Sequence, residues 1–302
     1  MRAGPSRTAL GVARLRAMHQ VKDGGAIFTD PFAVPLLGED ADALRRREDP
    51  PLMRRVRRFI AARSRIGEAF LARAVDRGVR QAVILGAGLD TFALRNPHAA
   101  RGLRVFEVDH PATQQHKRAR MAAASLAAPD CLVFVPVDFE RDDLAMALHQ
   151  AGFDADAPCF FLWLGVVAYL SREAIDATLR TIGGLADAEV VFDCTEPPEA
   201  YPDVLRAFVA DRRRRVASIG EPWVSHFRSV DLDPLLRAHG FTDCEDLDGA
   251  CIEAWLAEHA PGMPGPPIAG SHLVRARVHP RLTAGPVERI TPYLPELGSR
   301  RP

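Results

Sequence analysis

The chain has 302 residues, of which 47% are hydrophobic, and its 39 Lys and Arg balance its 39 Asp and Glu to a formal net charge of zero at pH 7. This balance removes the sequence-independent attraction to phosphate and to anionic lipid, so we expect neither a nucleic-acid partner nor a membrane partner. No run approaches the about twenty apolar residues that a membrane span needs, and the five cysteines form no C-x-x-C pair. We therefore expect a cytoplasmic protein whose ligand is a small molecule.

The first 78 residues are typical of helices, because Ala, Leu and Arg dominate and no convincing strand occurs. Pro31 follows Asp30 at a place where proline can open a new helix. Between residues 51 and 76 the apolar residues recur at roughly helical spacing. Four arginines lie among them, which we expect on a solvated face: Arg54, Arg55, Arg57 and Arg58. The segment 1–78 is thus predicted to be a helical N-terminal cap.

After residue 80, short apolar runs alternate with helical stretches. Five runs have the continuous apolar character of parallel strands buried on both faces: 82–85, 103–106, 132–135, 160–163 and 190–192. Two later candidates, 240–247 and 272–278, lie around a loop rich in Gly and Pro and can close the sheet as a hairpin, with the last strand antiparallel. We predict an α/β, Rossmann-like core over 79–280, with a mostly parallel seven-stranded sheet and helices on both faces, and a C-terminal tail over 281–302.

A glycine turn follows the first predicted strand, where Gly86, Ala87 and Gly88 precede a helix. Glycines at such a turn let the backbone approach a nucleotide, although on their own they often do no more than make the turn. The second strand ends at Asp109, about twenty residues further on, where a carboxylate can accept both ribose hydroxyls. Because Thr91 occupies the third glycine position of G-x-G-x-x-G, a nucleoside without pyrophosphate fits better than a dinucleotide.

The third predicted strand also ends in an acid, Asp138, with the aromatic Phe139 beside it. An acid at this edge can hydrogen-bond an adenine amino group. It can equally cap the helix that follows, which is common for Asp in this position, and the two roles are compatible.

These motifs resemble the leucine carboxyl methyltransferase-like family of class I S-adenosylmethionine-dependent methyltransferases, and in particular a bacterial subgroup of it. The main segments that carry the resemblance are VILGAGLDT at 83–91, FEVDHP at 106–111 with Lys117, TDPFA at 29–33, RSR at 63–65 and VDF at 137–139. It continues with WLGV at 163–166, YL at 169–170, FD at 192–193 and GEPW at 220–223. The resemblance covers residues 8 to about 250 and implies a class I methyltransferase that binds S-adenosylmethionine.

The resemblance also implies roles for individual residues. Arg63 would reach the methionyl carboxylate, the turn of Gly86, Ala87 and Gly88 would pass under the methionine part, Asp109 with the adjacent His110 would hold the ribose, and Asp138 with Phe139 would frame the adenine. Many members carry a glutamate just before the glycine that matches Gly165, to help hold the methionyl amino group, and this chain has Leu164 there. Backbone carbonyls at the end of the fourth strand can substitute for that contact.

The sequence identifies no catalytic residue and no metal site. Methyl transfer depends mainly on alignment and on the exclusion of water, and a carboxylate acceptor needs no base, whereas a hydroxyl or an amine benefits from one. The candidates for contact with a small acceptor follow the fourth and fifth strands or lie in the segment 220–228: Tyr169, Glu196, Trp223 and His226. Each of these side chains has a structural alternative, as a packed aromatic or an exposed loop residue. The histidines show no H-E-x-x-H and no zinc-ligand spacing with cysteine, so we expect no metal.

Two other functions stay open on the sequence alone. A nicotinamide-dependent oxidoreductase would use the same glycine turn and Asp109, although the missing third glycine counts against it. A non-catalytic protein that keeps the methyltransferase fold and binds a nucleoside would be consistent with Leu164 in place of the glutamate. The favoured interpretation is methyl transfer to a small molecule, at oxygen or at a carboxyl group.

Overall fold

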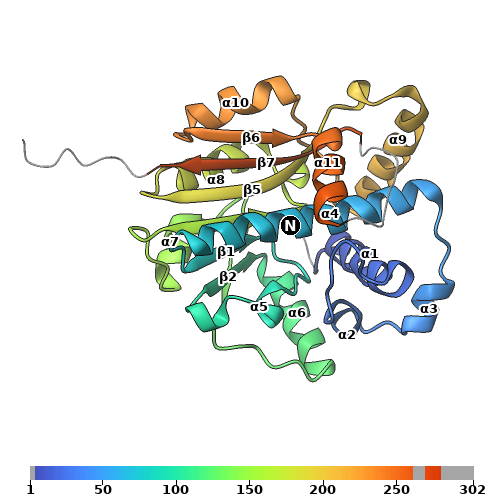
Figure 1. The fold of residues 1–302 in the computed structure, drawn as a ribbon, viewed down its shortest axis with the longest axis horizontal. Coiled ribbons are helices and arrows are strands. Elements are labelled where there is room, and N and C mark those ends of the chain that lie inside the picture. The colour runs from blue at the N-terminus through green and yellow to red at the C-terminus, as the bar shows by residue number, and fades with distance from the viewer. Residues whose placement is uncertain (1–3, 261–268, 280–302) are drawn as a thin grey trace, which may run out of the picture.

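The computed structural model describes residues 4–260 and 269–279, and Figure 1 shows a twisted sheet with helices around it. The sheet has seven strands in the order β3-β2-β1-β4-β5-β7-β6. The strands are β1 Gln81–Leu85, β2 Arg104–Asp109, β3 Leu132–Pro136, β4 Cys159–Trp163, β5 Ala188–Thr195, β6 Asp243–Leu247 and β7 Ser271–Val278. The first five are mutually parallel, and β7 runs antiparallel to both β5 and β6. The predicted mostly parallel, seven-stranded α/β fold is confirmed.

Apolar side chains on both faces of the strands hold the sheet in the core. Along β1, Val83 and Leu85 join the cluster on one face, while Ala82 and Ile84 join the cluster on the other. This alternation follows from the two-residue period of a strand, and it explains why the run is apolar at every position. The central strands β1 and β4 are buried at every residue, so their ends are the parts of the sheet that remain for a ligand.

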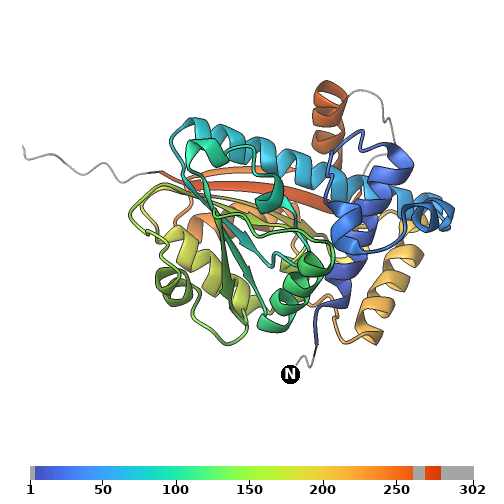
Figure 2. The same ribbon diagram turned by 90° about the horizontal axis from the view of Figure 1, so that it is seen from below.

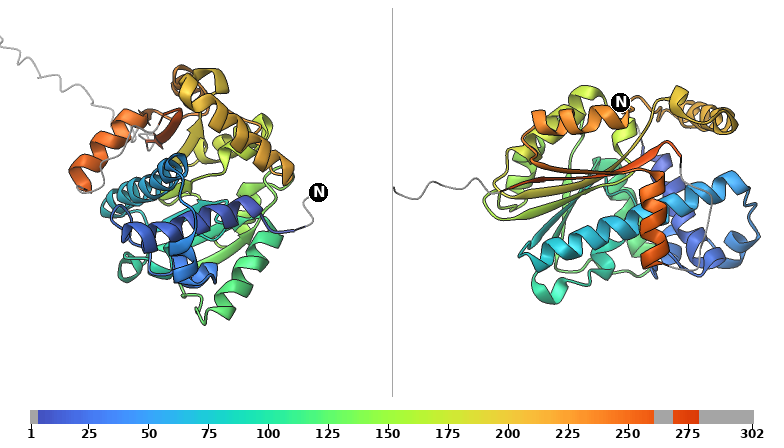
Figure 3. Two further views of the ribbon diagram at one scale, coloured as in Figure 1. Left: turned by 90° about the vertical axis from the view of Figure 1, so that its right-hand side faces the viewer. Right: turned by 45° about the horizontal axis from the view of Figure 1, so that its top comes forward.

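Helices cover the two faces and one end of the sheet. They are α1 Arg7–Asp23, α2 Ala33–Leu37, α3 Ala41–Arg46, α4 Pro51–Asp76, α5 Phe92–Arg95, α6 Pro111–Ala123, α7 Leu144–Gln150, α8 Arg172–Gly183, α9 Asp203–Ser218, α10 Ser229–Ala238 and α11 Gly249–His259, with short 3-10 turns η1 Ala99–Arg101, η2 Val167–Tyr169 and η3 Pro198–Ala200. The apolar sides of α7, α8 and α10 pack on one face, and those of α4, α5 and α11 on the other (Figures 2 and 3). The helices α1, α3 and α9 lie at the end where the parallel strands have their carboxyl termini (Figure 1). Among the described residues, no helix is long and apolar enough to cross a bilayer.

The arginine cluster of α4 corrects one expectation. Arg57 is buried and donates from Nε to Asp23 at 2.7 Å, and it also pairs with Asp49. Arg58 is buried against Glu253 of α11. The predicted solvated face is therefore wrong for these two residues, because acids from elsewhere in the chain compensate their charge.

The C-terminal part differs in one element from the predicted hairpin. The strands β6 and β7 do pair antiparallel, but the helix α11 lies between them in the chain. Its N-cap is Asp248, whose carboxylate accepts a hydrogen bond from the backbone of Cys251 at 2.8 Å. The tail predicted at 281–302 lies outside the described residues.

Candidate functional site

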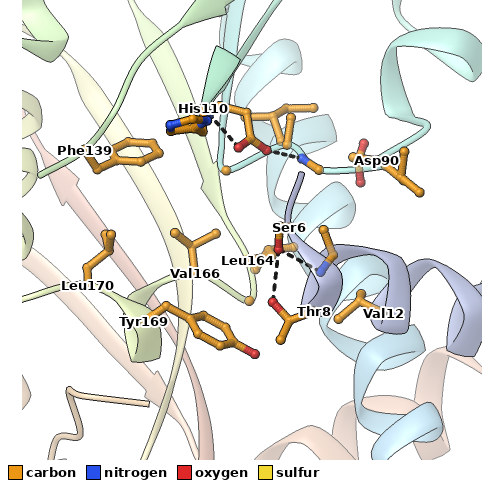
Figure 4. A pocket seen from close by; sticks show the side chains of 18 of the residues that line it. Ser6, Thr8, Val12, Asp90, His110, Phe139, Leu164, Val166, Tyr169 and Leu170 are labelled. Carbon is orange, nitrogen blue, oxygen red and sulfur yellow. Dashed lines mark hydrogen bonds between the residues drawn. The ribbon is translucent and has the colours of Figure 1, made fainter. Parts of the chain in front are cut away.

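One cavity of about 440 Å³ lies at the carboxyl ends of β1, β2 and β4, between the sheet and the helices α1 and α4. Ligands of open parallel sheets bind in this position. All nine residues predicted to bind the cofactor line it: Arg63, Gly86, Ala87, Gly88, Asp109, His110, Asp138, Phe139 and Leu164. Figure 4 shows the wall of this cavity, with Phe139 and His110 on one side and Leu164 near its middle. Parallel topology thus gathers residues that are up to about a hundred positions apart in the chain.

The glycine turn has a backbone conformation that only glycine adopts without strain. Gly86 has a φ of 65°, and a Cβ atom at this position would overlap the side chain of Val166. The backbone N–H groups of Gly86 and Ala87 both donate to the carbonyl of Val108, at 2.7 and 3.1 Å. The turn is thereby fixed over the end of β2, and its backbone is exposed to the cavity.

Asp109 is oriented by two backbone groups. Its Oδ2 accepts from the N–H of Gly88 at 2.5 Å and its Oδ1 from the N–H of His110 at 2.7 Å. Burial raises the pKa of this carboxyl and outweighs the opposing effect of these two donors. A carboxylate has about four acceptor directions, so two remain for a ligand that offers a pair of hydroxyl groups.

Arg63, on α4, belongs to a pair that the sequence did not reveal. Its Nη1 donates to Oδ2 of Asp193 at 2.6 Å, and Oδ1 of Asp193 accepts from the N–H of Gly165 at 2.5 Å. The Arg63 Nε is buried and makes no hydrogen bond within the described residues. The guanidinium is therefore anchored at one end and retains an unsatisfied donor, which suits a carboxylate ligand. The FD motif at 192–193 was the available signal for this contact.

Asp138 and Phe139 form the opposite end of the cavity. The Oδ1 of Asp138 accepts from the backbone N–H of Glu140 at 3.1 Å, which stabilises a turn. The cap of the following helix α7 is Asp143, whose carboxylate accepts from Met146 at 2.9 Å. The helix-capping role considered for Asp138 is therefore wrong, and its carboxylate lies at the cavity in a polar loop.

A buried network of ion pairs and hydrogen bonds lies next to the glycine turn. Arg16 donates to Asp90 at 2.7 Å and to Asp30 at 2.9 Å, and Thr91 also donates to Asp30 at 2.7 Å. Burial opposes ionisation of Asp90, but Arg16 and Lys117 outweigh it and lower the pKa of this carboxyl to about 2. Arg16 and Asp90 line the cavity, so α1 is tied to the glycine turn by charge.

Glu221, in the loop between α9 and α10, joins that loop to the N-terminal end of α1 beside the cavity. Glu221 accepts from the backbone N–H groups of Arg7 and Thr8, each at 2.9 Å, and from the hydroxyls of Ser6 and Thr8. Ser6 and Thr8 line the cavity together with Gly220 and Pro222, the neighbours of Glu221. We call this set of hydrogen bonds the Glu221 clasp. No local pattern predicts this clasp, although the GEPW motif at 220–223 contains Glu221.

Of the four acceptor candidates, Tyr169 lines the cavity, and Figure 4 shows its hydroxyl directed toward Thr8. The ring of Trp223 lies edge-on to that of Tyr169, with 6.5 Å between their centroids. Glu196 instead faces His272, with 3.4 Å between the carboxylate and Nε2. His226 lies 3.4 Å from Arg213. The structure thus brings Tyr169 and Trp223 together, and of the four candidates only Tyr169 is among the residues that line the cavity.

The sequence is similar to known methyltransferases. The leucine carboxyl methyltransferase family matches residues 9–183. A protein of Mycobacterium tuberculosis, provisionally named an S-adenosyl-L-methionine-dependent methyltransferase, is 32% identical over 285 residues, which cover 85% of this chain and 88% of that protein. The similarly named YktD of Bacillus subtilis is 35% identical over 188 residues, and the match covers 62% of each chain, which is less than two thirds of YktD.

A solved structure of a DUF574 family protein from Streptomyces avermitilis has the same fold, with a TM-score of 0.55 and 16% identity over 87% of this chain and 96% of that one. At this identity the likeness concerns the fold alone. The family match and the Mycobacterium relative extend over the strands that carry the glycine turn, Asp109 and Asp138. The chain therefore belongs to the leucine carboxyl methyltransferase family.

Proposed function

We propose that this member of the family transfers the methyl group of S-adenosylmethionine to a small-molecule acceptor, at an oxygen atom or at a carboxyl group. One observation carries the proposal: a single cavity is lined, in order, by Arg63, the glycine turn, Asp109 and the pair Asp138 and Phe139. The relatives named as S-adenosylmethionine-dependent methyltransferases support the same cofactor.

The residues present fit this cofactor. A cavity of about 440 Å³ lies in the usual range for a small-molecule site. The unsatisfied Nε of Arg63 suits a carboxylate, and the free acceptor directions of Asp109 suit the two ribose hydroxyls. Phe139 offers an aromatic surface to a base, with the carboxylate of Asp138 beside it. The glycine turn exposes its backbone to the cavity but lacks the third glycine of a pyrophosphate-binding turn. This favours S-adenosylmethionine over a dinucleotide.

The mechanism that the chain supports is alignment in a closed site. S-adenosylmethionine, when bound, supplies an electrophilic methyl group. Arg63, held by Asp193, would bind the methionyl carboxylate, Asp109 would hold the ribose, and Asp138 with Phe139 would hold the adenine at the far end. The Glu221 clasp joins α1 to the loop after α9 beside the cavity, where it would limit the entry of water. Tyr169 presents a hydroxyl that can orient the acceptor. Such positioning supplies much of the rate without a charged catalyst.

Leu164 gives the cavity an apolar side chain at a position where the family resemblance implies glutamate in many members. It lines the cavity, and Leu164 also approaches Gly67 of α4. Asp90 and Glu68 line the same cavity but are already paired, Asp90 with Arg16 and Glu68 with Arg95. The methionyl ammonium group would instead be held by backbone carbonyls at the end of β4. We therefore expect Leu164 to leave cofactor binding intact.

Calorimetry tests the proposed function. We expect S-adenosylmethionine and S-adenosylhomocysteine to bind the full chain, and NAD not to bind. Release of S-adenosylhomocysteine is then measured in the presence of each of a set of small hydroxylated compounds and carboxylic acids. A reaction without any acceptor is the control. Binding of NAD without binding of either sulfur nucleoside would contradict the proposal and favour an oxidoreductase. Tight cofactor binding with no turnover on any small acceptor would favour a non-catalytic role.

A further inference from the structure

The helix α9 carries an arginine that differs from its neighbours. Arg206 pairs with Asp203, and Arg214 and Arg215 both pair with Asp211, so each of these three guanidinium groups has an acidic partner within the helix. Neither Arg212 nor Arg213 forms an ion pair with a described residue, and Arg213 lies 3.4 Å from Nδ1 of His226. Arg212 differs from the others because its guanidinium lies over two aromatic rings, 5.0 Å from the centroid of Trp223 and 5.8 Å from that of Phe208.

The surroundings of Arg212 do not neutralise its charge. Burial lowers the pKa of Arg212, Tyr169 and Tyr201 oppose this without offsetting it, and the positive charge of Arg63 lowers the pKa further. The acid nearest to Arg63, Asp193, is already engaged by Arg63 and by the backbone of Gly165. Arg212 is thus a cation in a partly desolvated, aromatic environment beside a second cation. Binding of an anion stabilises such a group.

Arg212 and Trp223 do not themselves line the cavity, but Trp223 contacts and adjoins residues that do. The Trp223 ring beneath the Arg212 guanidinium is also in edge contact with Tyr169, and Tyr169 lines the cavity. Pro222 and Gly220, in the same loop as Trp223, line the cavity as well. Seen from the carboxyl end of the sheet, α9 and α1 both lie in front of the strands (Figure 3, left). The aromatic pair therefore connects the cofactor cavity to an unpaired cation.

We propose that Arg212 binds a carboxylate of the methyl acceptor, and that Trp223 and Tyr169 pack against the acceptor's apolar body. This inference rests on the proposed function and narrows its substrate to a small acid with a flat or aromatic body. A carboxylate fits the planar fork of one guanidinium, whereas a dianionic phosphate ordinarily has more donors around it. Two guanidinium hydrogen bonds lower the nucleophilicity of the bound carboxylate. That group is therefore an anchor, and a different group of the acceptor is methylated.

The test uses the full chain saturated with S-adenosylhomocysteine and matched pairs of probes, namely phenylacetate with phenylacetamide and 4-hydroxybenzoate with 4-hydroxybenzamide. Calorimetry should show that the wild type binds the acids more tightly than the amides. Arg212→Gln should weaken binding of the acids by about 10- to 100-fold and leave binding of the amides unchanged. Arg212→Lys, which keeps the charge but not the fork, should retain part of the preference.

Arg214→Gln is the matched control, because it makes the same change on the same helix at an exposed residue that already pairs with Asp211. It should bind acids and amides as the wild type does. Unchanged affinity for S-adenosylhomocysteine shows that Arg212→Gln is folded. The inference is overturned if Arg212→Gln binds the acids like the wild type, or if the wild type shows no acid preference or binds no probe. A wild type that does not bind S-adenosylhomocysteine contradicts the proposed function, and the inference falls with it.

Discussion

The Glu221 clasp gives the sharpest test of how the cavity is closed. Glu221 is 4% exposed, and both of its carboxylate oxygens are used: Oε1 accepts from Arg7, and Oε2 accepts from Ser6 and twice from Thr8. The carboxylate also lies at the N-terminal end of α1, where a negative charge interacts favourably with the helix dipole. Replacing it therefore removes charge and hydrogen bonds at the point where α1 meets the loop after α9.

The substitution Glu221→Gln keeps the shape and changes the chemistry. In either orientation of the amide, its NH2 group faces a backbone N–H, because each oxygen of the native carboxylate accepts from one. One buried donor is then left unsatisfied and the charge-assisted bonds are lost. A loss of about 2–3 kcal/mol in the free energy of unfolding follows from the usual penalty for such groups.

Urea unfolding measures this loss, and calorimetry with S-adenosylmethionine measures its effect on the cavity, which we expect as weaker binding because Ser6 and Thr8 line it. Glu39→Gln is the matched control. Glu39 also pairs with α1, through Arg14, but the two side chains are 31% and 27% exposed, and such pairs contribute less than about 1 kcal/mol. If Glu221→Gln is no less stable than Glu39→Gln and binds the cofactor like the wild type, the clasp does not close the site.

Three further predictions concern single residues. Asp109→Asn should weaken binding of S-adenosylmethionine by about tenfold or more, because the amide NH2 of the asparagine must face the backbone N–H of either Gly88 or His110. Calorimetry measures the affinity, and an unchanged value would remove Asp109 from the site. Gly86→Ala should lower the free energy of unfolding, measured in urea, more than Gly102→Ala does. Both glycines have a positive φ, but only at position 86 would the added Cβ meet a side chain. Equal losses of unfolding free energy in the two variants would contradict this account. Burial opposes protonation of His272, but Asp246 and Glu196 outweigh it and raise the pKa of His272 above 6.5. Protonated His272 therefore stabilises the folded state fully at pH values below 6.5, and this contribution is lost as the pH rises through the pKa of His272 in the folded state. His272→Gln should flatten that pH dependence of the unfolding free energy, and an unchanged slope would refute the assignment.

The sequence by itself predicted the seven strands and the residues at the carboxyl ends of the first three. Continuous apolar runs identify buried parallel strands, because a strand covered on both faces must be apolar at every position. Once the strands are parallel, their carboxyl ends lie at one edge. Gly86, Asp109 and Asp138 therefore had to come together, whatever the details of packing. The glycine turn, Asp109 and Asp138 needed only local patterns and this topological rule, whereas Arg63 and Leu164 were named from the family resemblance.

The tertiary structure alone decided the contacts between distant segments. The pairs Arg63–Asp193, Arg58–Glu253 and Thr8–Glu221 each join residues more than a hundred positions apart. No periodicity links such residues, since their meeting depends on how helices dock on the finished sheet. For the same reason local patterns misplaced Arg57 and Arg58 on a solvated face and assigned a possible helix cap to Asp138. The isolated charge of Arg212 likewise became visible only when α9 was seen to lie over Trp223 rather than beside an acid.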